Sequence, residues 1–81
     1  MSKRFRFQSF GHVDEDVLRF ELLDGEDILF EMRAAKDGVA HVDFHQSALD
    51  RVIPAEQLIE LLREGCRLVA DDWKDSGKMS G

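Results

Sequence analysis

The sequence predicts a two-layer α+β domain, in which a four-stranded antiparallel β-meander carries one C-terminal helix on one face (β-β-β-β-α). Two observations predict it. Four segments between Arg4 and Gln46 alternate polar and apolar residues with the period of a β-strand. A single amphipathic segment that begins at Pro54 then supplies one element that can cover the apolar face of those strands.

The four alternating segments each present apolar side chains at every second position, so that one face of the sheet is apolar and the other polar. Such a pattern is typical of antiparallel strands that are buried on one side only. We expect the core face to be led by Phe20, Phe30 and Phe44. The apolar positions are Phe5 and Phe7, then Leu18, Phe20 and Leu22, then Ile28, Phe30, Met32 and Ala34, and finally Ala40, Val42 and Phe44.

Glycine-containing turns predict how the strands pair. Lys36-Asp37-Gly38 and Asp24-Gly25-Glu26 both have the composition of a three-residue hairpin loop with glycine at a left-handed position. The connection from Gly11 to Asp16 gives a weaker indication. The pairs predicted in this way are Phe30 with Phe44, Met32 with Val42, Ala34 with Ala40, Leu22 with Ile28, Phe20 with Phe30, and Phe7 with Phe20. On the polar face they set Arg19 opposite Glu31, which is attractive, and Glu31 opposite Asp43, which is repulsive.

The helix is predicted to begin with Pro54, because proline fixes a helical backbone angle and is favoured in the first turn. Gly65 leaves two interpretations. The helix continues to about Asp72, or it ends at the glycine and a short strand follows from Cys66 to Ala70. The continuous helix is favoured, since the polar residues stay in helical phase across Gly65. The expected apolar stripe consists of Leu58, Leu61, Leu62, Leu68, Val69 and Trp73.

Length and composition predict one globular domain over residues 1–73 and a disordered tail over 74–81, where Met79 is the only apolar residue. A single cysteine excludes an intramolecular disulfide and fits a reducing compartment. No apolar run is long enough for a membrane span, and the N-terminus is not that of a signal peptide. We therefore expect a cytoplasmic protein without a membrane partner.

His41, Asp43 and His45 form the nearest approach to a metal-binding motif. On a strand their side chains share the polar face, and imidazole and carboxylate groups are zinc ligands. A zinc site needs more convergent ligands than this pattern offers, so no metal or other cofactor is predicted. Cys66 is expected to be a small core thiol on the side of the sheet away from the histidines. Without a catalytic arrangement, the sequence predicts that the protein is not an enzyme.

An alternative function is the binding of single-stranded nucleic acid by Lys3, Arg4 and Arg6, which alternate with Phe5 and Phe7. The order of four strands and a helix resembles the coactivator-type single-strand DNA-binding fold in layout, without a shared motif. Such binders need aromatic and cationic side chains on one surface. The alternation instead directs both phenylalanines into the core, and the net charge of −6 repels nucleic acid.

Several apolar residues occupy positions that the predicted register sends to solvent, in particular Leu23 near Leu29 and Phe10 near Val17. Apolar patches on the outside of a sheet are typical of protein-binding surfaces. The acidic residues Asp14, Glu15 and Asp16 extend this region in the first loop. The sequence therefore predicts a small acidic, non-enzymatic protein-interaction module that forms a homodimer, through the outer face or edge strands of its sheet, or binds another protein.

Overall fold

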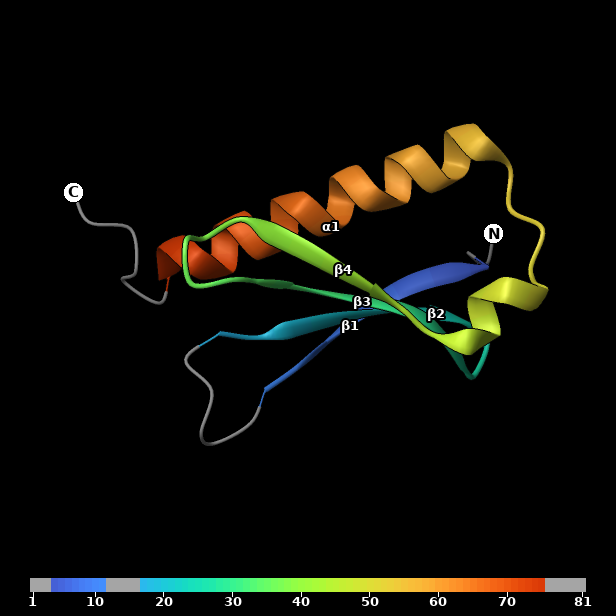
Figure 1. Ribbon diagram of the computed structural model, residues 1–81, viewed down its shortest axis with the longest axis horizontal. Helices are drawn as coiled ribbons and strands as arrows, with labels where there is room; N and C mark the ends of the chain where they lie inside the picture. Colours follow the sequence, from blue (N-terminus) through green and yellow to red (C-terminus); the bar gives the residue numbers. More distant parts are fainter. Residues whose placement is uncertain (1–3, 12–16, 76–81) are drawn as a thin grey trace.

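The computed structural model describes residues 4–11 and 17–75. Four strands form one antiparallel sheet in the order β1-β2-β3-β4, followed by a short 3₁₀ helix and a long α-helix (Figure 1). The predicted fold class is confirmed. The predictions made for Lys3, Asp14, Glu15 and Asp16 lie outside the described residues. The elements are β1 (Phe5–Phe10), β2 (Arg19–Asp24), β3 (Asp27–Ala34), β4 (Ala40–Phe44), η1 (Gln46–Asp50) and α1 (Ala55–Asp75).

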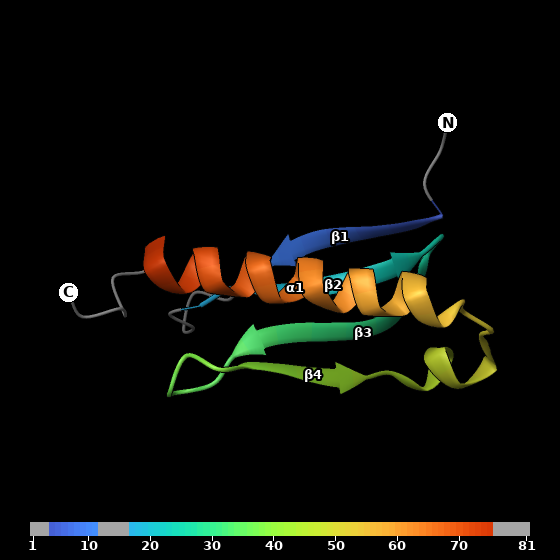
Figure 2. The ribbon, with the colours of Figure 1, turned by 90° about the horizontal axis from the view of Figure 1, so that it is seen from above.

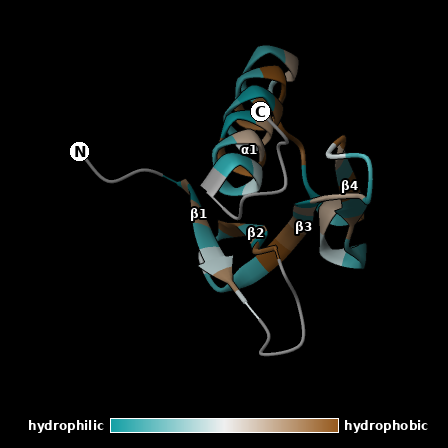
Figure 3. Ribbon diagram, turned by 90° about the vertical axis from the view of Figure 1, so that its left-hand side faces the viewer, coloured by the Kyte–Doolittle hydropathy of each residue, from teal (hydrophilic) through white to brown (hydrophobic). Residues whose placement is uncertain are grey.

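Helix α1 lies along the middle of the sheet and leaves β4 at the uncovered side (Figures 2 and 3). Its apolar stripe is the one that the sequence predicts: Val69 is buried in the core, and the other predicted stripe residues pack against it. The helix forms the second layer, which buries the apolar face of the sheet. The core cluster consists of Phe5, Phe20, Leu22, Leu29, Phe30, Met32, Ala34 and Val69.

The helix continues through Gly65, which confirms the favoured interpretation. Gly65 is buried, and a Cβ at this position would overlap the Met32 side chain and come within 3.4 Å of Phe7 Cζ. Glycine therefore allows the helix to approach the sheet closely. Cys66, the next residue, is turned away from this contact and is exposed, so the prediction of a core thiol is wrong.

Helix α1 ends at Asp75, beyond the predicted end near Asp72. Two residues that the sequence assigns to the tail are thus helical, and 76–81 lie outside the described residues. Lys74 in the last turn complements the negative end of the helix dipole, as Glu56 complements the positive end in the first turn. Among the described residues, no helix is long and apolar enough to cross a membrane.

The hairpin between β3 and β4 has the predicted loop and register. Gly38 has a φ of 84°, and Ala35 N–H donates to Val39 O at 2.9 Å to close the turn. All predicted pairs of this hairpin are confirmed, from Phe30 opposite Phe44 to Ala34 opposite Ala40. Gly38 also lies against the Trp73 ring of α1, so this turn is held by the end of the helix.

The hairpin between β2 and β3 differs from the prediction. Asp24 pairs directly with Asp27, which leaves a two-residue turn with Gly25 at a φ of 65° instead of a three-residue loop. Beyond the turn, Leu29 is an extra residue in β3 that has no partner on β2. The shorter turn and this β-bulge each move the pairing by one residue. Their sum keeps the large apolar residues on the core face, because a shift of one alone would reverse the faces.

The pairs observed in place of the predicted ones are Leu22 with Phe30 and Phe20 with Met32. In the first hairpin Phe7 pairs with Leu22 instead of Phe20, so the register of β1 on β2 also differs from the predicted one by two residues. Glu31 consequently lies opposite Glu21 and not Arg19, although Arg19 still reaches it at 3.8 Å along a diagonal.

Leu23 and Leu29 are buried, which contradicts their predicted exposure. Leu29 is the bulge residue, and the bulge turns it into the same cluster as Leu22 and Phe30. The segment after β4 contributes further cover at this end of the sheet, since η1 packs against β3. Both leucines are therefore removed from the predicted outer patches.

Candidate interaction surface

The uncovered side of the sheet exposes apolar residues of β4. Val42 and Phe44 lie on the helix-facing side, yet 39% and 54% of their surfaces are exposed. Phe44 contacts only part of the core, with its ring edge-on to Phe30 at a centroid distance of 5.5 Å. The prediction of Phe44 as a leading core residue is therefore wrong, because α1 does not extend over β4 (Figure 2).

Helix α1 adds Ile59 to the same side of the molecule. Ile59, Cys66 and Trp73 recur every seven residues and therefore lie on one side of the helix. Trp73 contacts Gly38 in the turn that begins β4, so this side of the helix is the one that borders β4. Ile59 is 49% exposed. We call the set Val42, Phe44 and Ile59 the apolar strip.

The backbone of β4 presents an open edge next to the apolar strip. Val39 accepts a hydrogen bond from Ala35, and His45 N–H donates to Leu29 O at 2.8 Å, so the odd-numbered residues are turned toward β3. In an antiparallel strand the orientation alternates from residue to residue. Ala40, Val42 and Phe44 therefore direct their N–H and C=O groups away from the sheet. These groups form the open edge.

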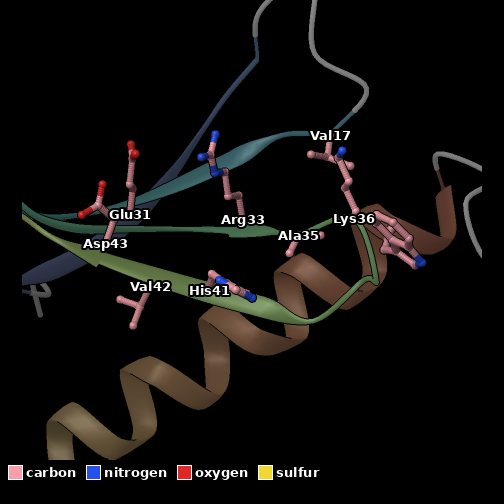
Figure 4. A pocket seen from close by; sticks show the side chains of 10 residues that line it. Val17, Glu31, Arg33, Ala35, Lys36, His41, Val42 and Asp43 are labelled. Carbon is pink, nitrogen blue, oxygen red and sulfur yellow. The ribbon is translucent and has the colours of Figure 1, made fainter.

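The opposite face of the same strands is charged. Arg33 lies opposite His41, and Glu31 lies opposite Asp43. Figure 4 shows Glu31, Arg33 and Asp43 pointing to the face away from α1, whereas Val42 points toward the helix. We call Arg33 and His41 the basic rung and Glu31 and Asp43 the acidic rung. All four residues line one surface pocket.

The two rungs are not balanced within one copy of the chain. Glu31 has Arg19 at 3.8 Å, but Asp43 is exposed and, in the part of the chain that the structure describes, forms no ion pair. The carboxylates of Glu31 and Asp43 face one another across adjacent strands, which is unfavourable. An external cation beside Asp43 would relieve this repulsion.

The three residues considered as a weak metal-site candidate differ in exposure. His41 and Asp43 are exposed, whereas His45 is half-buried and its backbone is bonded to Leu29. Within residues 4–11 and 17–75, no group of at least three His, Cys, Asp or Glu side chains is arranged to hold a metal ion. Because His41 and Asp43 lie on the edge strand β4, they are instead candidates for contacts with another chain.

Of the remaining predicted interaction residues, Phe10 and Val17 are described, whereas Asp14, Glu15 and Asp16 lie outside the described residues. Phe10 is 43% exposed and Val17 half-buried, at the far end of β1 and before β2. Sequence reasoning missed the apolar strip because Val42 and Phe44 have a regular core pattern. Only the position of α1 over the sheet shows that they are left uncovered.

The structure describes Arg4 and Arg6 of the nucleic-acid alternative, whereas Lys3 lies outside the described residues. Phe5 is buried and Phe7 half-buried. Arg4 is engaged with Asp24 at 2.9 Å, and its guanidinium lies 4.6 Å from the centre of the Phe5 ring. Arg4 is thus engaged by contacts within the domain, while Arg6 is exposed.

Comparisons with known proteins add no assignment to this surface. No protein-family model matches the chain, and no curated protein or solved structure matches it. The open edge, the apolar strip and the two rungs are the features from which a function can be inferred.

Proposed function

We propose that the chain is a small acidic, non-enzymatic protein-interaction module that forms a homodimer through β4. The observation that carries this proposal is the exposure of Val42 and Phe44 directly beside the open edge. Main-chain hydrogen bonds to an added strand supply affinity, and the side chains that flank the strand supply selectivity. Burial of the apolar strip would contribute about 25 cal/mol for each Å² removed from water.

Edge strands in monomeric proteins are usually protected by lysine, proline or a bulge. The β4 sequence contains neither lysine nor proline, and its pairing with β3 is regular. The other edge strand, β1, carries the exposed Arg6 as its second residue and follows Arg4. Of the two edges, β4 is therefore the one suited to pairing with another strand.

Sedimentation velocity over a micromolar concentration series tests the proposal. We expect the wild-type chain to sediment as a dimer, and Phe44→Lys to sediment as a monomer because a cation would be buried in the interface. Leu49→Lys is the matched control: Leu49 is 80% exposed on η1, so the same substitution there leaves the dimer intact. Circular dichroism verifies that both variants are folded.

A wild-type chain that remains monomeric throughout the series would overturn the proposal. Equal dissociation by Phe44→Lys and Leu49→Lys would also count against β4 as the binding surface. The proposal does not depend on the acidic residues 14–16.

A further inference from the structure

We infer that two copies of the chain pair β4 with β4 in one register, antiparallel and centred on Val42, so that the basic rung of each copy meets the acidic rung of the other. This inference rests on the proposed function and specifies the partner surface. The result would be a continuous sheet across both copies, with the two helices on the same face.

Symmetry restricts the possible registers. When a two-fold axis relates two antiparallel copies of a strand, one residue lies opposite its own copy. Centring on Val42 pairs Ala40 with the partner's Phe44, and every residue of the open edge then exchanges main-chain hydrogen bonds. Centring on His41 or on Asp43 leaves Phe44 or Ala40, respectively, beyond the paired segment. The Val42 register therefore uses the open edge most completely.

Charge selects the same register. Centring on Val42 places His41 opposite the partner's Asp43, and the symmetry repeats this pair on the other side of the axis. These are the pairs without mutual main-chain hydrogen bonds, in which side chains approach most closely. Centring on His41 would instead oppose two imidazoles, and centring on Asp43 would oppose two carboxylates, which repel.

Residues of the neighbouring strand β3 extend the pairing of opposite charges. Arg33 lies beside His41, and Glu31 lies beside Asp43 in the same copy. Across the interface the row therefore runs from Arg33 through His41 to the partner's Asp43 and then to the partner's Glu31. The half of the row that contains Arg33 and His41 meets the acidic half of the second copy, so that Asp43 has an imidazole opposite it, with the Arg33 cation next in the row.

The Val42 register also suits the apolar side chains on the helix-facing side of the sheet. Phe44 lies opposite the partner's Ala40, whose small side chain leaves room for the ring. Val42 lies against its own copy, and Ile59 of each helix borders the junction. One register thus covers the apolar strip on one face and joins opposite charges on the other.

Two single substitutions test the interface without weakening the fold of the single chain. His41→Glu places a carboxylate opposite Arg33 in its own copy, and Asp43→Lys places a cation opposite Glu31, so both improve the pairs within the sheet. Across the interface His41→Glu opposes two carboxylates in both symmetric pairs, and Asp43→Lys removes the acidic partner of His41 from both. We expect each variant alone to weaken dimerisation by about tenfold, measured as Kd by sedimentation equilibrium.

Mixing the two variants gives the complementary measurement. Glu at 41 in one copy then faces Lys at 43 in the other, while the native His41 and Asp43 face each other. We expect heterodimers to exceed either homodimer in native mass spectrometry, and the double variant His41→Glu/Asp43→Lys to regain an affinity close to that of the wild type.

The outcomes distinguish the inference from the proposed function. A wild-type monomer overturns both. A stable wild-type dimer that is indifferent to the single substitutions, or single variants that show no preference for the heterodimer, overturns the register and leaves dimerisation through β4 in place.

Discussion

The guanidinium of Arg51 lies 3.1 Å from the Asp24 carboxylate and thereby ties the segment after β4 to the end of β2. Arg4, at the start of β1, binds the same carboxylate at 2.9 Å. Arg51 also reaches Asp27 across the β2–β3 turn. Asp24 therefore joins the first strand, the turn and the segment that leads into α1, at the end of the sheet opposite the Trp73 contact.

Asp24 should make stability depend on pH. The hydrogen bond from Arg4 is the main cause that lowers the pKa of Asp24 in the folded chain, with Arg51 adding to it and desolvation opposing it. Because the pKa is lower in the folded chain, the ionised carboxylate stabilises the fold at pH values above the ordinary aspartate pKa, near 3.9. This contribution is lost as the pH falls from there through the lowered folded-state pKa. Urea unfolding should show Asp24→Asn less stable than wild type at neutral pH.

That difference should shrink as the pH approaches the folded-state pKa of Asp24, where the wild-type carboxylate is itself protonated. Asp50→Asn, at an exposed acid of η1, serves as the control and should change little. A constant difference between wild type and Asp24→Asn at all pH values would contradict the prediction.

Leu29→Ala should destabilise the fold by about 2–5 kcal/mol, the range for truncating a fully buried leucine. Leu29 has no exposed surface and belongs to the core cluster. Leu49→Ala, on the exposed surface of η1, should change stability by less than about 0.5 kcal/mol. Chemical denaturation measures both variants, and similar small losses would show that the bulge does not bury Leu29.

Gly65→Ala should lower stability although alanine is the better helix former. The added methyl group would overlap Met32, and overpacking of this kind costs about 1–3 kcal/mol, against about 1 kcal/mol gained from helix propensity. Met32→Ala removes the obstructing side chain. In the double variant the Gly65→Ala substitution should therefore become favourable, and a thermodynamic cycle of the four proteins measures this coupling.

Gly38→Ala and Gly25→Ala form a matched pair. Both glycines have positive φ, which costs an alanine about 1–2 kcal/mol. A Cβ at Gly38 would also come within 2.9 Å of the Trp73 ring, whereas nothing lies within 4 Å of one at Gly25. Gly38→Ala should be the more destabilising, and its thermal unfolding should also show a changed tryptophan fluorescence. Equal losses would exclude a role for the Trp73 contact.

The sequence could predict which residues face the core, because the period of a strand and the stripe of a helix are local properties. Phe20 and Phe30 are found on the expected face for this reason. The register of β2 could not be obtained in the same way, since the turn at Gly25 admits two lengths and the bulge at Leu29 has no sequence signature. Two one-residue errors in the same direction left the faces right and the pairs wrong.

The candidate interaction surface was harder to predict than the fold. The sequence predicts Leu23 and Leu29 on the outer face, whereas both are buried, and it predicts Phe44 in the core, whereas this side chain is exposed. Alternation specifies on which side of the sheet a residue lies, but whether that side is covered depends on where α1 crosses. The charged residues His41 and Asp43 were identified, but their significance depends on β4 being an edge strand.

The bulge at Leu29 and the two-residue turn at Gly25 have a joint consequence for how this hairpin can change in length. Loss of Leu29 would remove the bulge and leave a regular hairpin with a two-residue turn, in which Leu22 still lies opposite Phe30. The bulge therefore adds one residue to β3 without changing the pairs on either side of it. Because this extra residue is fully buried, its deletion should lower stability while the pairing of Leu22 with Phe30 stays intact.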